Sequence, residues 1–196
     1  MANYFEMSRK ELAAEKEKLE ESYKKFQDMG LKLNMARGKP GPHQMDLAMG
    51  LLQMTDYTTD AGTDARNYGD LEGLHEAREL FADVMGVKPE EVFVGGNSSL
   101  QLMYNLISMG YSFGFPESPC PWSQVPNRKF LCPVPGYDRH FAITEEFGFE
   151  LISVPMSPTG PDMDMIEKLV AEDDTIKGIW CVPQYSNPDG YTYSDE

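Results

Sequence analysis

The segment Gly95-Gly96-Asn97-Ser98-Ser99 has the composition of a turn that binds a phosphate group. It lies between a predicted strand and a predicted helix, so unpaired backbone N–H groups at the helix start would point at a ligand. The glycines let the backbone approach that ligand closely, and Asn97, Ser98 and Ser99 add side-chain donors. An ordinary turn with a serine cap explains the same residues equally well. The segment alone therefore does not distinguish a phosphate-binding turn from an ordinary turn.

Three other stretches carry residues that could meet a ligand. Tyr68 precedes a helix, Tyr137 ends a Pro-Gly-Tyr stretch after one strand, and Asn187 begins an Asn-Pro-Asp-Gly turn after another. A tyrosine ring can lie on a flat ligand, and an amide can donate a hydrogen bond. Because ligands collect at the C-terminal ends of strands in open α/β sheets, we expect Tyr137 and Asn187 to face the same cavity as Asn97 and Ser98.

Motifs for other chemistries are missing from the sequence. There is no Gly-x-Ser-x-Gly elbow of a hydrolase and no P-loop. A nucleotide-binding domain is a weaker alternative, because Gly-x-Gly-x-x-Gly and its acidic ribose ligand are also missing. No metal site is expected, since the three histidines have no ligand partner at metal-binding spacing (His43, His75 and His140). The cysteines form no Cys-x-x-Cys pair, which indicates free thiols in a reducing compartment (Cys120, Cys132 and Cys181).

The composition indicates a soluble, acidic protein of the cytoplasm. The 196 residues include 17 Lys and Arg against 32 Asp and Glu, a net charge of −15. Such an excess of carboxylates argues against nucleic acid or an anionic membrane as the main partner. The N-terminus lacks the apolar stretch of a secretory signal, and no apolar run approaches the roughly 18 residues that span a bilayer. The hydrophobic content of 41% is sufficient for a packed core.

The elements that must position these residues begin with a helix over residues 8–29. Ser8 and Glu11 have the spacing of a capping box, and Gly30 suits the end of the helix. Expected i,i+4 ion pairs are Glu20–Lys24 and Glu21–Lys25. One face of the helix carries an apolar stripe that needs a surface to cover it (Leu12, Leu19, Tyr23 and Phe26).

Beyond residue 34, strands alternate with helices of about ten residues, which predicts a sheet with helices on both faces. The expected strands are residues 91–94, 130–134, 150–154 and 176–182. The expected helices are residues 70–84, 98–109, 138–147 and 162–170. Residues 110–129 form a proline-rich loop long enough to be a lid or an interface loop. We therefore expect an N-terminal helical segment, residues 1–33, and an α/β domain, residues 34–196.

Five motifs in this order resemble those of fold-type I pyridoxal-phosphate (PLP) enzymes, in the class I, aspartate-aminotransferase-like family. They are RGKP, YGDLEG, GGNSSL, PGY and NPDG, starting at Arg37, Tyr68, Gly95, Pro135 and Asn187. The resemblance implies that residues 34–196 are the N-terminal part of the large PLP-binding domain and that residues 1–33 are part of the small domain or arm. It also implies an aminotransferase that moves an amino group from aspartate, or a similar amino acid, to a 2-oxo acid by means of PLP.

The resemblance also implies a set of cofactor contacts. Asn97, Ser98 and the adjoining Ser99 match the turn that binds the cofactor phosphate. Tyr137 matches the aromatic residue that stacks on the pyridine ring, and Asn187 matches the asparagine that meets the ring hydroxyl oxygen.

Two further contacts implied by the resemblance involve the substrate and a second subunit. Gly38 matches the glycine that meets the substrate carboxylate. Tyr68 matches the tyrosine that reaches the cofactor phosphate of the neighbouring subunit, which implies a homodimer. Asp189 stands where the family more often has threonine, at a position outside the cofactor contact.

The Schiff-base lysine of the family lies beyond its Asn-Pro-x-Gly turn, so the resemblance places it beyond Glu196. Lys168 and Lys177 match no family lysine. Ser194-Asp195-Glu196 has the pattern of a helix start, so we expect the sequence to be truncated and the isolated chain to be inactive. The alternative to truncation is a frayed tail at this end. The alternative function is a non-catalytic remnant or binding module of the same fold.

Overall fold

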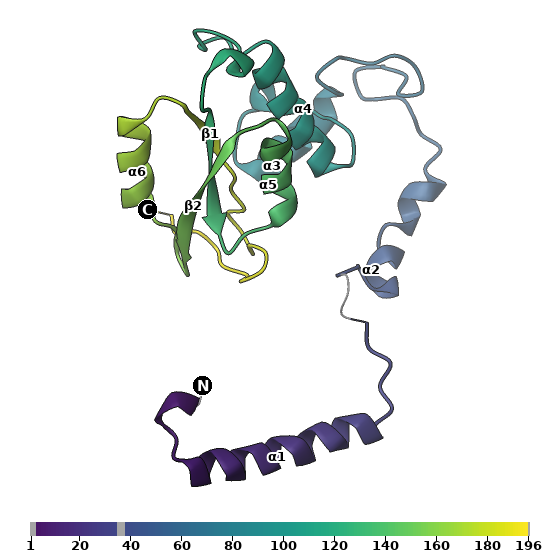
Figure 1. The fold of residues 1–196 in the computed structure, drawn as a ribbon. Helices are drawn as coiled ribbons and strands as arrows, with labels where there is room; N and C mark the ends of the chain where they lie inside the picture. Colours follow the sequence, from purple (N-terminus) through teal and green to yellow (C-terminus); the bar gives the residue numbers. More distant parts are fainter. Residues whose placement is uncertain (1–2, 35–37, 196) are drawn as a thin grey trace. The chain divides into compact units, whose positions relative to one another are not determined.

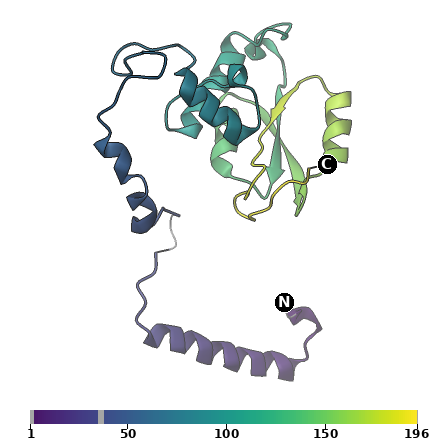
Figure 2. The ribbon, with the colours of Figure 1, turned by 180° about the vertical axis from the view of Figure 1, so that it is seen from behind.

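The computed structural model describes residues 3–34 and 38–195, and the chain forms two compact units, Met1–Thr58 and Thr59–Glu196 (Figure 1, Figure 2). The domain boundary expected between residues 33 and 34 falls inside the first unit and stays a prediction. Arg37, the first residue of one motif, lies outside the described residues.

The main element of the first unit is helix α1, Arg9–Asp28. Its capping box is confirmed, because Ser8 N donates to Glu11 Oε2 at 2.8 Å and Glu11 N donates to Ser8 Oγ at 3.4 Å. Gly30 follows the helix with a left-handed φ of +59°, which suits glycine. The apolar stripe is exposed (Leu12, Leu19, Tyr23 and Phe26).

The ion pairs predicted on α1 are wrong. Glu20 pairs with Lys16 at 3.5 Å and Glu15 with Lys18 at 3.3 Å, in place of Glu20–Lys24 and Glu21–Lys25. Lys16 and Lys24 are both four residues from Glu20, so spacing alone does not choose between them. Exposed pairs of this kind contribute little to stability, and either choice costs the helix almost nothing.

The first unit also contains three short helices that the sequence analysis does not predict. They are η1, Tyr4–Glu6, α2, Pro42–Asp46, and η2, Met49–Gln53. Helix α2 begins at a proline, whose fixed φ suits the first helical position.

The second unit is built on a four-stranded sheet with the order β3-β2-β1-β4. The strands are β1, Lys129–Val134, β2, Glu150–Ser157, β3, Gly160–Pro161, and β4, Ile176–Ile179. Strand β1 pairs in parallel with β2 and β4, whereas the short β3 runs antiparallel to β2. In this register Leu131 lies beside Ile152 on one side and Ile179 on the other.

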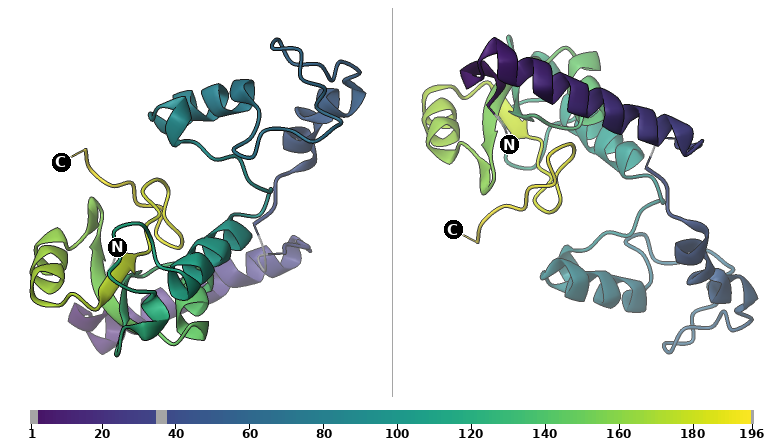
Figure 3. Two further views of the ribbon diagram at one scale, coloured as in Figure 1. Left: turned by 90° about the horizontal axis from the view of Figure 1, so that it is seen from above. Right: turned by 90° about the horizontal axis from the view of Figure 1, so that it is seen from below.

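Helices cover both faces of the sheet, as predicted (Figure 3). They are α4, Ser99–Ser112, and α5, Asp138–Glu146, on one face and α6, Met163–Glu172, on the other, whereas α3, His75–Met85, packs against η3, Pro89–Glu91, and contributes to neither core cluster. Side chains alternate along a strand, so Phe130 packs with Ile107 of α4 on one face, whereas Leu131 packs with Ile166 of α6 on the other. This two-sided burial makes β1 the centre of the core.

Two predictions about the second unit are wrong. Residues 91–94 form no strand: Pro89–Glu91 are a 3₁₀ helix, η3, and Val94 N donates to Glu72 O as a single backbone bond. A strand needs a neighbour along its length, and the described residues supply none here. Of the two roles expected for the segment 110–129, the lid is wrong, because Trp122 in the short helix η4, Trp122–Gln124, is buried in the core. The interface role stays a prediction.

The ends of other elements also shift. Helix α3 begins at His75 rather than near residue 70, because the chain turns at Gly73, where φ is +100°. Strand β4 ends at Ile179, although Trp180 N still donates to Leu131 O at 3.1 Å. In the described part of the chain no helix is both long and apolar enough to cross a membrane.

Candidate functional site

A small cavity lies where β1 and β4 end, and Tyr137 and Asn187 both line it. Its other polar and aromatic lining includes His140, Trp180, Ser186 and Tyr193. The Val134–Pro135 and Asn187–Pro188 peptide bonds beside it are cis. The structure therefore brings together two of the residues that the sequence assigned to one site.

Tyr137 is held at the junction between β1 and α5. It is the N-cap residue of α5 and is half-buried. Gly136 precedes it where a side chain would not fit, because an added Cβ would overlap Pro133 O and lie 2.7 Å from Phe141 Cζ. The glycine thus lets the chain pass close to β1 before Tyr137 enters the cavity.

Asn187 is carried by a loop that its own backbone closes. Ser186 N donates to Tyr191 O at 2.8 Å, and Tyr191 N donates to Ser186 Oγ at 3.1 Å. Further out, Tyr193 N donates to Pro183 O at 2.8 Å. The loop is fixed on both sides of Asn187, whose exposed side chain remains available to a ligand.

His140 is the titratable group of this cavity with the strongest burial. It is 9% exposed, and its ring centroid lies 5.0 Å from that of Tyr137 at an interplanar angle of 84°. Burial lowers the pKa of His140, because the charged imidazolium loses its hydration. The neutral imidazole is therefore the form that packs against Tyr137.

The start of α4 has the geometry of an anion site. Ser98 caps the helix, and its Oγ accepts from Gln101 N at 3.3 Å. Among the described residues, the backbone N–H groups of Ser99 and Leu100 donate no hydrogen bond. Asn97, Ser98 and Ser99 are exposed, so hydroxyl, amide and backbone donors meet at the positive end of the helix.

The structure does not place Asn97 and Ser98 in the cavity of Tyr137 and Asn187. Ser98 instead lines a second hollow, together with Arg139 and Glu146 of α5. Both hollows border α5, which contributes His140 to the first and Arg139 to the second. The expected single cavity is therefore divided by this helix in the chain as it stands.

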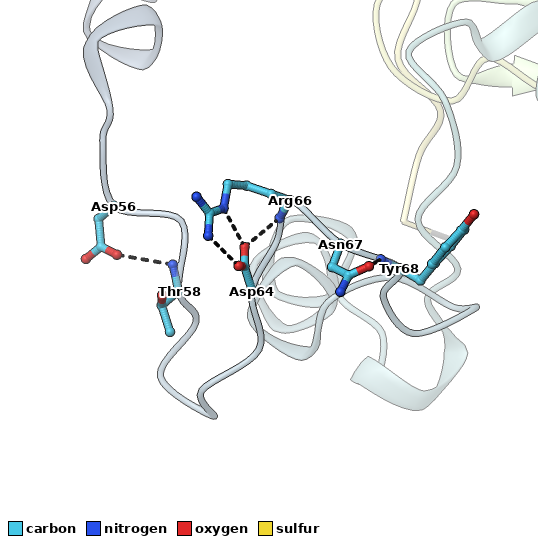
Figure 4. A network of polar contacts seen from close by, with 6 residues as sticks. All are labelled: Asp56, Thr58, Asp64, Arg66, Asn67 and Tyr68. Carbon is cyan, nitrogen blue, oxygen red and sulfur yellow. Dashed lines mark hydrogen bonds and ion pairs between the residues drawn. The ribbon is translucent and has the colours of Figure 1, made fainter.

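Tyr68 lies in the second unit and is fully exposed, pointing away from its own segment (Figure 4). The turn before it is tied by a two-pronged ion pair, in which Arg66 Nη2 and Nε donate to Asp64 Oδ2 and Oδ1 at 2.6 and 2.9 Å. These bonds lower the pKa of Asp64. Because Tyr68 is exposed, its phenol is open to contact with another surface.

Gly38 is an exposed residue of the first unit, and open space surrounds the position of an added Cβ. In the same unit, Asp56 Oδ1 accepts from Thr58 N at 3.2 Å (Figure 4). The arrangement of the two units is not defined, so the role of Gly38 stays a prediction.

Reasoning from the sequence missed several residues that line the cavity. The sequence analysis considers His140 only as a metal ligand, although it lies one helical turn after Tyr137 and so on the same side of α5. Trp180 and Tyr193 gave no sequence signal, because their approach depends on how β4 and the loop after it fold back. None of the described side chains that line the cavity is a lysine.

The described residues also show how the cysteines and the possible metal ligands are placed. No cluster of three or more His, Cys, Asp or Glu that could hold a metal ion occurs in residues 3–34 and 38–195. The thiols of Cys120, Cys132 and Cys181 are free, and burial raises the pKa of Cys132 to about 12. Cys132 is thus a protonated, apolar part of the core rather than a nucleophile.

Comparisons with known proteins agree with the fold and the motifs. The profile of the family described as aspartate amino-transferase matches residues 7–196. A Mycolicibacterium smegmatis protein named as an aminotransferase is 50% identical over 195 residues, which is 97% of this chain and 46% of that protein. An aspartate aminotransferase of Corynebacterium glutamicum is 46% identical over 183 residues, covering 92% of this chain and 42% of its own length.

A solved structure gives the same result. The crystal structure of an aspartate transaminase from Corynebacterium glutamicum superimposes with a TM-score of 0.85 at 44% identity, over 96% of this chain and 45% of that one. The chain therefore spans less than half the length of these relatives.

Proposed function

The chain belongs to the aspartate amino-transferase family, and on this premise we propose that it contributes the cofactor-binding half of a PLP-dependent transaminase. Its fold is that of the fold-type I large domain, in an incomplete form. The observation that carries the proposal is the meeting of Tyr137 and Asn187 in one cavity at the ends of β1 and β4, where α/β folds bind ligands.

The donor types, taken over both hollows, suit the phosphate and the ring of PLP. The start of α4 offers N–H and hydroxyl donors to a phosphate ester through Ser98 and Ser99. Tyr137 offers an aromatic face to a pyridine ring, and the Asn187 amide offers a donor to a ring oxygen. When bound, PLP supplies an electron sink for reactions at the α-carbon of an amino acid.

The residues of this chain bind and orient rather than transfer protons. Asn97, Ser98 and Ser99 would hold the phosphate, Tyr137 would fix the plane of the ring, and Asn187 would set its rotation. The reacting lysine would come from a part of the enzyme outside these 196 residues. Orientation of this kind lowers the barrier by holding the reactants in place before reaction.

The amino donor that we propose is aspartate or a similar amino acid, with a 2-oxo acid as acceptor. The support is the resemblance of Gly38 to the glycine that meets the substrate carboxylate, together with relatives named as aspartate aminotransferases. The cytoplasm is the compartment that we propose, on composition alone.

The phosphate role of Ser98 predicts different results for two substitutions that both keep the helix cap. Ser98→Asp and Ser98→Asn both cap helices well, but only aspartate adds a negative charge beside the phosphate. In the full-length enzyme we expect Ser98→Asp to weaken PLP retention at least about tenfold relative to Ser98→Asn. Equilibrium dialysis measures this difference, and equal affinities for the two variants would refute the phosphate assignment.

The exposed phenol of Tyr68 supports a homodimer in which Tyr68 serves the partner's site. We expect Tyr68→Phe in the full-length enzyme to weaken PLP retention about tenfold, the scale of one hydrogen bond to a charged group. Heterodimers of this variant with a lysine-dead variant should recover normal retention at their one lysine-bearing site. A monomer at micromolar concentration that keeps its PLP would contradict the shared site.

The alternative function is a binding module without catalysis, which keeps half of the fold. Transamination assays on the full-length protein, with aspartate and a 2-oxo acid, separate the two. Binding of PLP with no amino transfer from any dicarboxylic amino acid would favour the module.

A further inference from the structure

A partly buried hydrogen bond joins the helix that carries Tyr137 to the strand that leads to Asn187. Trp180 Nε1 donates to Thr144 Oγ1 at 3.2 Å. Thr144 lies on α5, whose N-cap residue is Tyr137, and Trp180 directly follows β4, seven residues before Asn187. The bond therefore links the two elements whose ends carry the proposed ring contacts.

The Thr144 hydroxyl has a polar role rather than a packing role. Thr144 is 0% exposed, and its Oγ1 donates to Phe141 O at 3.0 Å while it accepts from Trp180. Burial of a hydroxyl costs free energy unless it is hydrogen-bonded, and valine would fill nearly the same space without that requirement. The two bonds use the donor and one acceptor position of the hydroxyl, so its polar group is satisfied.

His140 makes a second connection between the same elements. Its ring lies 5.0 Å from Tyr137 and 5.6 Å from Trp180, between centroids. Trp180 also contacts Phe130 of β1, at 5.1 Å. Because Trp180 is in contact with β1 and α5 together, α5 cannot turn about its axis without losing the Thr144 bond and the ring contacts.

We propose that Thr144 and Trp180 are positioning residues, which hold Tyr137 in a fixed place relative to Asn187. Tyr137 and Asn187 contact PLP in the proposed function, and the inference rests on that function for the identity of the ligand. A site whose groups are held in place before binding loses less entropy when the ligand arrives. Loss of the Thr144–Trp180 bond should therefore weaken ligand binding at a distance from the ligand.

A test without ligand uses nuclear magnetic resonance on the 196-residue chain. In Thr144→Val, the Trp180 indole N–H should shift, and the signals of the Tyr137 ring and the Asn187 amide should shift or broaden with it. The matched control is Thr55→Val, the same chemical change at an exposed residue. Changes confined to Trp180 and its direct neighbours, with Tyr137 and Asn187 unmoved, would overturn the inference.

A second test measures PLP binding in the full-length enzyme with a double-mutant cycle. Trp180→Phe removes the indole N–H and keeps an aromatic ring. Thr144→Val and Trp180→Phe should each raise the Kd for PLP about threefold to tenfold, the range of one hydrogen bond. The Kd of the double variant should not exceed the higher of the two single-variant Kd values, since both changes remove the same bond.

The two tests separate the inference from the proposed function. Additive losses in the cycle would show that Thr144 and Trp180 act independently of their shared bond, and this would overturn the inference. Unchanged Kd values with a lowered melting temperature would show a purely structural bond and would overturn it as well. If the wild-type enzyme binds no PLP, the proposed function fails, and the resonance test alone decides whether the bond positions Tyr137 and Asn187.

Discussion

Replacement of Gly136 by alanine is expected to displace Tyr137 and so to disrupt the cavity that it lines. The new Cβ would overlap Pro133 O, a backbone atom of β1, and lie 2.7 Å from Phe141 Cζ. The strand cannot yield without breaking its pairing with β2, so Tyr137 must move. Overpacking of this kind costs about 1–3 kcal/mol, and we expect PLP retention in the full-length enzyme to fall about tenfold to a hundredfold.

The matched control for this change is Gly69→Ala. An added Cβ at Gly69 meets only Leu74 Cδ2, at an ordinary 3.9 Å, and its φ is not in the left-handed region. Thermal unfolding and equilibrium dialysis give the two readouts. A Gly136→Ala enzyme with the stability and PLP affinity of the Gly69→Ala control would mean that the close approach to β1 does not position Tyr137.

The fold of the second unit could be predicted where the pattern is local. Strands 130–134 and 150–154 and the helices between residues 98 and 172 follow from the alternation of short apolar runs with helical periodicity. The segment 91–94 has the same β-branched and aromatic pattern, yet it forms no strand. Its conformation depends on a neighbouring strand, and a pattern within four residues cannot indicate whether such a neighbour exists.

The residues of the candidate site also differ in whether the sequence could predict them. Tyr137 and Asn187 could be found from sequence, because Pro-Gly-Tyr and Asn-Pro-Asp-Gly are turns at strand ends. Thr144 and Trp180 could not, since their relation depends on a contact between residues 36 positions apart. The separation of Ser98 from the cavity of Tyr137 also escaped prediction, because it follows from the place of α5 between the two hollows.

Helix α5 borders both hollows of the candidate site. The helix contributes residues to the cavity of Tyr137 and to the hollow of Ser98, and it packs against α4, which begins at the proposed phosphate turn. A small rotation of α5 would therefore change the distance between a bound phosphate and a stacked ring. We therefore expect substitutions of Gly136, which precedes the helix, and of Thr144, which lies within it, to have clear effects on PLP binding.

Borohydride reduction of the 196-residue chain mixed with PLP is expected to leave no lysine carrying a stoichiometric pyridoxyl group. A lysine that bonds covalently to PLP must be deprotonated in a desolvated pocket beside the ring. Lys129 is instead paired with Asp173 at 2.7 Å, which raises the pKa of its ammonium group and keeps it protonated. Lys168 is exposed on α6, and Lys177 lines a different hollow, where it donates to Asp174 O.

Peptide mass mapping after the reduction distinguishes the outcomes. Exposed lysines should carry scattered, substoichiometric label that falls in proportion when the PLP concentration is lowered. The full-length enzyme, treated in the same way, should carry one label at a lysine outside these 196 residues. A single stoichiometric label at Lys168 or Lys177 in the chain would contradict the proposal that the reacting lysine lies outside these 196 residues. It would place the reacting amine in the same part of the enzyme that binds the phosphate and the ring.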